Sequence, residues 1–81
     1  MTGRPARRRR AAGPHGLTPR QVEIVALLMR GHGTKEIADR LYLRPQSVRN
    51  AIHRIGVALG VSGRLRIVAR ARELGIAPAD E

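Results

Sequence analysis

The spacing of apolar positions between residues 17 and 76 predicts four helices and no strand. Apolar side chains recur every three or four residues, and no segment alternates with a period of two. Glycines that suit helix ends interrupt this pattern at Gly31 and Gly33, at Gly60 and at Gly75. We therefore expect an all-α, four-helix domain over residues 17–76, preceded by an arm (residues 1–16) and followed by a short tail (residues 77–81).

The first helix is predicted to begin in the segment LTPRQ. Thr18 suits the N-cap, Pro19 suits the first helical position, and Gln21 stands where a capping box requires it. Apolar residues then cover most of the helix circumference as far as Met29. A helix that is apolar nearly all round is expected to be the most buried of the four.

A short second helix is predicted from Thr34, which we expect to be its N-cap. Its inward residues would be Ile37, Ala38 and Leu41. Pro45 disfavours helical geometry at the residue before it and suits the first turn of a new helix. A tight turn is therefore expected between the second and third helices.

The third helix, over about residues 45–59, is predicted to have one apolar side and one polar side. The apolar stripe follows helical spacing and consists of Val48, Ile52, Ile55 and Leu59. The opposite side carries Gln46, Asn50, His53 and Val57, with Arg49 and Arg54 beside them. A fourth helix is expected from about residue 63 to residue 74, with Ile67, Val68, Ala71 and Leu74 facing inward.

The net charge of the chain restricts the kinds of partner that this helical domain could bind. The chain of 81 residues has 16 Lys and Arg against 6 Asp and Glu, a net charge of +10. Such an excess favours a polyanionic partner, either nucleic acid or an anionic membrane. No run approaches the roughly 20 apolar residues that span a bilayer, and the arginine tract is not followed by a signal-peptide core. Nucleic acid is therefore favoured, and we expect a soluble, intracellular protein.

The residues that catalysis or metal binding would need are missing from the sequence. There is no cysteine, and the three histidines (His15, His32 and His53) are scattered. No paired carboxylates, Ser/His/Asp set or glycine-rich phosphate loop is recognisable. We therefore expect no enzyme activity, no metal, no cofactor and no small-molecule ligand.

The segment TKEIADRLYLRPQSVRNAIHRI, residues 34–55, has the short helix, turn and longer helix of helix-turn-helix DNA readers. Between Arg40 and Arg72 there are eight arginines and no acid, whereas solvated helix faces usually mix the two signs. Arginine can pair with guanine and asparagine with adenine in the major groove. The polar side of the third helix is therefore predicted to read DNA.

Four segments extend this interpretation to a family: LTPRQVEIVALLMRG, TKEIADRLYL, SVRNAIHRI and LGVSGR. Together they resemble the LuxR-type (GerE-type) helix-turn-helix domain of bacterial transcription regulators, from Leu17 to about Ile76. Region 4 of sigma factors shares the middle segment but differs after Leu59. The resemblance implies a sequence-specific regulator that binds double-stranded DNA, with its third helix in the major groove. It also implies a place in the bacterial cytoplasm, at the nucleoid.

The same resemblance implies roles for individual residues. Arg49, Asn50 and His53 would contact bases, and we add Gln46 because it shares their face. Phosphate contacts would come from Thr34, Lys35, Ser47, Arg54 and Arg64. The fourth helix is the family's dimerisation surface, which here corresponds to Leu65, Ala69 and Arg72.

Four residues depart from the family pattern: Tyr42, Arg44, Gly63 and Arg66, the last of which stands near the positive end of the fourth helix, where Glu is frequent. Tyr42 stands where a turn glycine is frequent, and a left-handed conformation there would cost about 1–2 kcal/mol. Arg44 and Gly63 replace the usual side-chain caps of the third and fourth helices. Each missing cap is expected to cost about 0.5–1 kcal/mol of stability.

The arm is basic and lacks periodic apolar residues, so it is expected to be disordered. Its arginines are Arg4, Arg7, Arg8, Arg9 and Arg10. The segment Gly3-Arg4-Pro5 is the core of the AT-hook, which favours binding in narrow A·T minor grooves. The full AT-hook has a basic residue before the glycine, where this chain has Thr2. A tail that binds phosphates without regard to sequence is therefore the favoured interpretation, and minor-groove binding is the alternative.

Two other functions remain open at this level. The chain could be a small partner-binding module that acts on RNA polymerase or another regulator. It could also be a nucleoid-type protein that binds DNA without regard to sequence.

Overall fold

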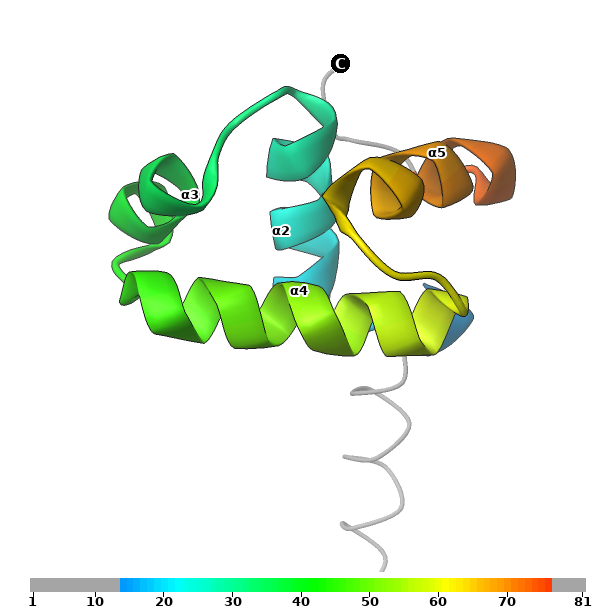
Figure 1. The fold of residues 1–81 in the computed structure, drawn as a ribbon, viewed down its shortest axis with the longest axis horizontal. Coiled ribbons are helices and arrows are strands. Elements are labelled where there is room, and N and C mark those ends of the chain that lie inside the picture. Colours follow the sequence, from blue (N-terminus) through cyan, green and yellow to red (C-terminus); the bar gives the residue numbers. More distant parts are fainter. Residues whose placement is uncertain (1–13, 77–81) are drawn as a thin grey trace, which may run out of the picture.

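The computed structural model describes residues 14–76 and is all-α over that range, as the sequence predicts (Figure 1). A single 3-10 turn is followed by four α-helices. The elements are η1 (Pro14–Gly16), α2 (Pro19–Met29), α3 (Thr34–Leu41), α4 (Pro45–Leu59) and α5 (Arg64–Leu74). The arm arginines and the tail lie outside the described residues. Within residues 14–76, no helix is both long and apolar enough to cross a membrane.

The helix α2 is the centre of the domain. It packs against α3, α4 and α5, and its residues Ile24, Val25 and Leu28 are buried. In Figure 1, α4 runs along one edge of the domain while α2, α3 and α5 all lie on the same side of it. Among residues 14–76, the opposite side of α4 is therefore left free of other helices.

Caps define where α2 and α3 begin. The capping box predicted for α2 is present: Gln21 N–H donates to Thr18 Oγ1 at 3.1 Å, and Thr18 N–H donates to Gln21 Oε1 at 2.9 Å. The prediction that Thr34 caps α3 is wrong. The N-cap is Gly33, whose N–H donates to Glu36 Oε1 at 3.1 Å. Because this carboxylate reaches back to Gly33, the helix includes Thr34 as its first residue.

Three residues have positive φ angles at the turns around α4: Tyr42, Gly60 and Gly63. Tyr42 ends α3 in the left-handed region (φ 59°, ψ 42°), as its unusual place in the turn suggests. Gly63 precedes α5 with φ 97° and ψ 147°, a region open essentially to glycine alone. Gly63 makes no side-chain cap bond, as expected, and a Ser or Asn would be strained at this φ angle.

The core consists of aliphatic side chains, and no polar or charged side chain is buried among residues 14–76. Each helix contributes the residues predicted for it, although Leu41, Ile52, Val68 and Leu74 are only partly buried. Two further core residues lie outside the helices. Leu17 is fully buried before α2, and Ile76 is buried after α5. They close the core at both ends of the described chain.

Candidate nucleic-acid interface

The exposed side of α4 has five residues that together we call the recognition face: Gln46, Arg49, Asn50, His53 and Val57. All five are exposed, so the four side chains predicted to contact bases are accessible together. Val57 is 70% exposed and adds an apolar group to an otherwise polar surface. The face is positioned by the apolar stripe on the other side of the same helix.

That stripe holds α4 firmly against the rest of the domain. Val48, Ile55 and Leu59 are buried, and they contact a core in which α2, α3 and α5 all take part. Gly56 is also buried, and a Cβ atom at this position would lie 2.7 Å from the carbonyl oxygen of Val61. The loop after α4 can therefore fold back closely along the helix.

Hydrogen bonds connect three residues of the recognition face. Gln46 Nε2 donates to Asn50 Oδ1 at 3.1 Å, and Arg49 Nη1 donates to Gln46 Oε1 at 3.3 Å. Gln46 thus orients both the arginine and the asparagine. Because all three side chains are exposed, these bonds can be exchanged for bonds to a ligand without leaving a buried group unpaired. His53 is exposed one turn further along and is not part of this network.

Residues predicted to contact phosphates lie at two places beside this face. Arg64, at the start of α5, donates from Nη2 to Thr34 Oγ1 at 3.1 Å, and Lys35 is the next residue of α3. Ser47 and Arg54 instead lie together on α4. The structure therefore brings the predicted set together as two groups and not as one patch.

Two grooves run along α4. The first, which we call the α2 groove, lies between α4 and the start of α2, and its lining includes Ser47, Asn50 and Arg54. The second, the loop groove, lies between α4 and residues 61–63, and its lining includes Arg49 and His53. At 100° per residue, the centres of these two sets lie roughly 110° apart around the helix, one on each side of the recognition face. The recognition face is therefore a ridge with a groove on each side.

Negative charge is absent from this ridge. The described acidic residues are Glu23, Glu36, Asp39 and Glu73, and none is on α4. Three of them contact nearby side chains: Glu23 with Arg20 at 3.6 Å, Glu36 with His32 at 3.2 Å, and Glu73 with Arg70 at 3.0 Å. Arg54 has no hydrogen-bond or ion-pair partner among residues 14–76. The ridge thus presents positive charge that described acids do not compensate.

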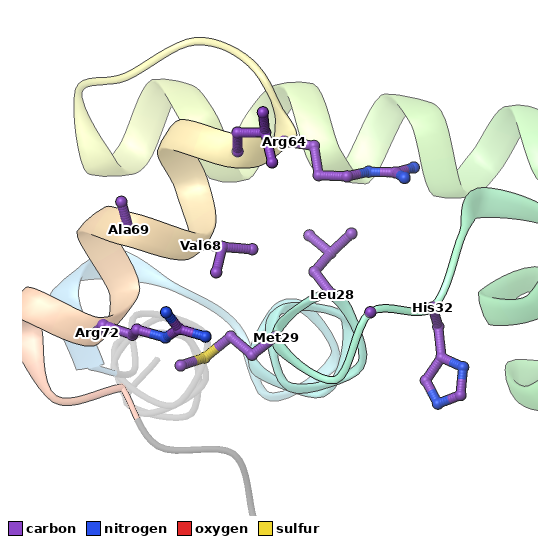
Figure 2. A pocket seen from close by; sticks show the side chains of 9 residues that line it. Leu28, Met29, His32, Arg64, Val68, Ala69 and Arg72 are labelled. Atoms are coloured by element: carbon purple, nitrogen blue, oxygen red, sulfur yellow. The ribbon is translucent and has the colours of Figure 1, made fainter.

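Another surface lies on α5, where the sequence predicts dimer contacts. Leu65 is 83% exposed, and Ala69 and Arg72 are exposed on the same face of the helix. These residues border a groove between α5 and the end of α2 (Figure 2). Figure 2 shows Leu28 of α2 and Val68 of α5 on facing sides of this groove, and these two side chains make its floor apolar.

Sequence reasoning missed several residues of the interface region. Gly56 was not singled out, although a glycine inside a helix is a signal that another backbone comes close. Arg20 and Gln21 line the α2 groove but were assigned only to the first helix. No pattern along the chain indicates that the start of α2 lies beside α4, because that proximity is a property of the tertiary fold.

Known proteins of one family are similar to this chain in sequence. The model of the family described as "Bacterial regulatory proteins, luxR family" matches residues 15–71. The spore germination protein GerE of Bacillus subtilis is 39% identical over 59 residues, which are 73% of this chain and 80% of GerE. The transcriptional regulatory protein DesR of the same species is also 39% identical over 59 residues, which are 30% of DesR.

Longer relatives match as well. An HTH-type transcriptional regulator of Mycobacterium bovis is 34% identical over 73 residues, which are 90% of this chain but only 8% of the relative. The chain thus spans less than a tenth of the length of that mycobacterial protein. No solved structure matches the chain significantly. The family match covers most of the described domain and confirms the resemblance seen in the sequence: the chain belongs to the luxR family of bacterial regulatory proteins.

Proposed function

We propose that residues 17–76 are the DNA-binding domain of a bacterial transcription regulator, and that α4 enters the major groove as its recognition helix. The observation that carries this proposal is the recognition face itself, which is exposed, polar and free of acids. It is backed by a buried aliphatic stripe. An α-helix about 10–12 Å across fits a major groove about 12 Å wide. Membership of a family of regulatory proteins supports the same function.

Base reading is assigned to Gln46, Arg49, Asn50 and His53. Arginine is suited to the two acceptors of guanine, and asparagine to the donor and acceptor of adenine. The hydrogen bonds through Gln46 restrict both side chains before DNA arrives. Less side-chain entropy is then lost on binding, which favours a defined base preference.

Phosphate binding is assigned to the two groups beside the ridge. Thr34, Lys35 and Arg64 would contact one strand, whereas Ser47 and Arg54 would contact the other. Contacts of this kind fix the register of the helix and carry no sequence information directly. They should make the affinity strongly dependent on salt.

The arm is assigned to additional DNA contacts through Arg4 and Arg7–Arg10. Its point of attachment supports this role, because η1 packs against α4. Thirteen residues precede Pro14, and at 3.3–3.6 Å per residue they could span at most about 45 Å. The arm could therefore reach a minor groove next to the bound major groove.

Deleting residues 1–12 distinguishes the two ways in which the arm could act. Loss of its five arginines should flatten the slope of log K against log salt by about 3–5. A loss of affinity that is equal on every sequence indicates phosphate binding. A loss confined to sites flanked by A·T tracts indicates minor-groove reading.

A second copy of the chain is the proposed partner of the α5 surface. Leu65, Ala69 and Arg72 share one exposed face, and the neighbouring groove is floored by Leu28 and Val68 (Figure 2). Replacing Leu65 with Asp should weaken binding to a two-half-site duplex and leave binding to a single half-site unchanged.

Selection from a random duplex library tests the proposed function. We expect recovery of a palindromic site to which Arg49→Ala binds about 1–3 kcal/mol more weakly, with relaxed preference at one base pair. If the wild-type chain binds the selected duplex no better than random DNA, sequence-specific regulation is contradicted. Uniform binding would then indicate a nucleoid-type protein, and co-purification with RNA polymerase after DNase treatment would indicate a partner-binding module.

A further inference from the structure

The α2 groove has a second wall whose role the recognition helix does not explain. One wall is formed by Ser47, Asn50 and Arg54 of α4. The other is formed by Thr18, Arg20 and Gln21 at the start of α2. The side chains of Thr18 and Gln21 are used in the capping box, so Arg20 is the residue of this wall that is available to a ligand.

When α4 lies in the major groove, the width of that groove places a sugar-phosphate backbone of the DNA at the α2 groove. A helix that fills the major groove has a sugar-phosphate backbone on each side, because the helix and the groove have similar widths. Grooves lie on both sides of α4. The wall formed by α2 therefore faces the outer side of the strand that Ser47 and Arg54 contact from α4.

The present partner of Arg20 does not prevent such a contact. Arg20 Nη1 lies 3.6 Å from Glu23 Oε1, and both side chains are more than half exposed. Exposed pairs of this kind contribute little to stability. A phosphate offers shorter, charge-assisted hydrogen bonds and can replace the carboxylate. Glu23 then remains beside the phosphate and repels it.

We propose that Arg20 is a further DNA contact, which binds a phosphate from the α2 side of the groove while Arg54 binds the same strand from the α4 side. The inference rests on the proposed function, because it needs α4 in the major groove. Arg20 reads no base, so its contribution is equal on all sequences. Glu23 lowers the affinity by competing for Arg20.

The chain contains a matched control for this proposal. Arg70 and Glu73 form the same i,i+3 pair on α5, at 3.0 Å and with similar exposure, and neither residue lines a groove beside α4. Arg20→Ala and Arg70→Ala remove the same charge, and Glu23→Gln and Glu73→Gln remove the same acid. A difference in DNA affinity between the two matched variants therefore reflects where the residue lies and not the change in net charge.

The experiment measures fluorescence anisotropy of the full chain on a selected duplex and on random duplexes, over a salt series. We expect Arg20→Ala to bind all duplexes several-fold more weakly and to reduce the salt slope by about 0.9, the value for one phosphate contact. Arg20→Lys should retain the slope, and Glu23→Gln should bind more tightly than wild type. The Arg70 and Glu73 variants should change the affinity less.

Two results would overturn the inference while leaving the proposed function intact. The first is an equal salt slope for Arg20→Ala and Arg70→Ala. The second is an Arg20→Lys variant that loses as much affinity and as much salt slope as Arg20→Ala. The second result would mean that Arg20 acts on the fold and not through its charge. If wild type fails to bind duplex DNA at all, the proposed function itself fails. Thermal unfolding of each variant confirms that the fold is retained.

Discussion

Arg64 and Thr34 are joined by a hydrogen bond between the first turn of α5 and the first turn of α3, with Nη2 and Oγ1 3.1 Å apart. The two residues are thirty positions apart in the chain, and both are predicted phosphate contacts. The hydroxyl of Thr34 accepts from Arg64 and keeps its own hydrogen free to donate. The pair can therefore offer two adjacent donors to one phosphate.

Arg64→Ala should weaken binding to every duplex and lower the salt slope by about 0.9. Its effect on the free energy of unfolding should stay within about 0.5 kcal/mol, because the side chain is exposed. Thr34→Val should cause a smaller loss of affinity. Since the two residues share a bond, the double variant should lose less than the sum of the single losses. Strictly additive losses would show that the two side chains act independently.

Gly56→Ala gives a test of the tight contact between α4 and the loop that follows it. Helix propensity alone predicts that alanine stabilises this position by about 1 kcal/mol. The added Cβ would, however, lie 2.7 Å from Val61 O, which is a backbone atom and cannot move aside as a flexible side chain could. We expect a net destabilisation of about 1–3 kcal/mol in urea unfolding. The matched control is Val57→Ala at the next, exposed position, and a more stable Gly56→Ala would contradict the described contact.

The helices and the exposed face of α4 could be predicted because each depends on spacing within one segment. Periodicity along the chain shows which side of α4 is apolar, and Thr18 and Gln21 lie close enough in sequence to be recognised as a capping box. Gly56 and Gly63 have roles that depend on where another segment passes or on a φ angle. A glycine inside a helix indicates that another backbone comes close, but neither the identity of Val61 as that neighbour nor the φ of Gly63 leaves a periodic signal. These two details therefore had to come from the fold.

Tyr42→Gly should stabilise the domain. Tyr42 has φ 59° and is 95% exposed, so its side chain gains nothing from packing against the domain. Relief of the left-handed conformation is worth about 1 kcal/mol, or about 4–8 °C in Tm for a domain of this size. Tyr42→Ala keeps the strain and should gain little. A fall in Tm for Tyr42→Gly would show that the ring contributes to stability.

The carboxyl group of Glu36 should make stability depend on pH in the acid range. The N–H of Gly33, and then the side chain of His32, lower the pKa of Glu36 below its ordinary value. A group whose pKa is lower in the folded state stabilises that state fully above its unfolded pKa. This stabilisation is lost as the pH falls through the folded pKa.

Urea unfolding of wild type and Glu36→Gln at a series of pH values measures this effect. The wild-type advantage in free energy of unfolding should be largest near neutral pH and should shrink on acidification. It should continue to shrink below the range in which an unperturbed glutamate titrates. A difference that stays constant from neutral to strongly acidic pH would contradict the role of Glu36 as a charged acceptor for Gly33.

Leu17 should be indispensable although it lies outside every helix. Its side chain is fully buried in the core that holds α4 in place. Leu17→Ala should therefore lower the free energy of unfolding by about 2–5 kcal/mol, which is a large part of the total stability of a small domain. Leu27→Ala, at a partly buried position, should cost less. Deletion of residues 1–12 should leave the Tm unchanged, whereas deletion through residue 17 should unfold the domain. Equal stability of the two deletion variants would show that the core closes without Leu17.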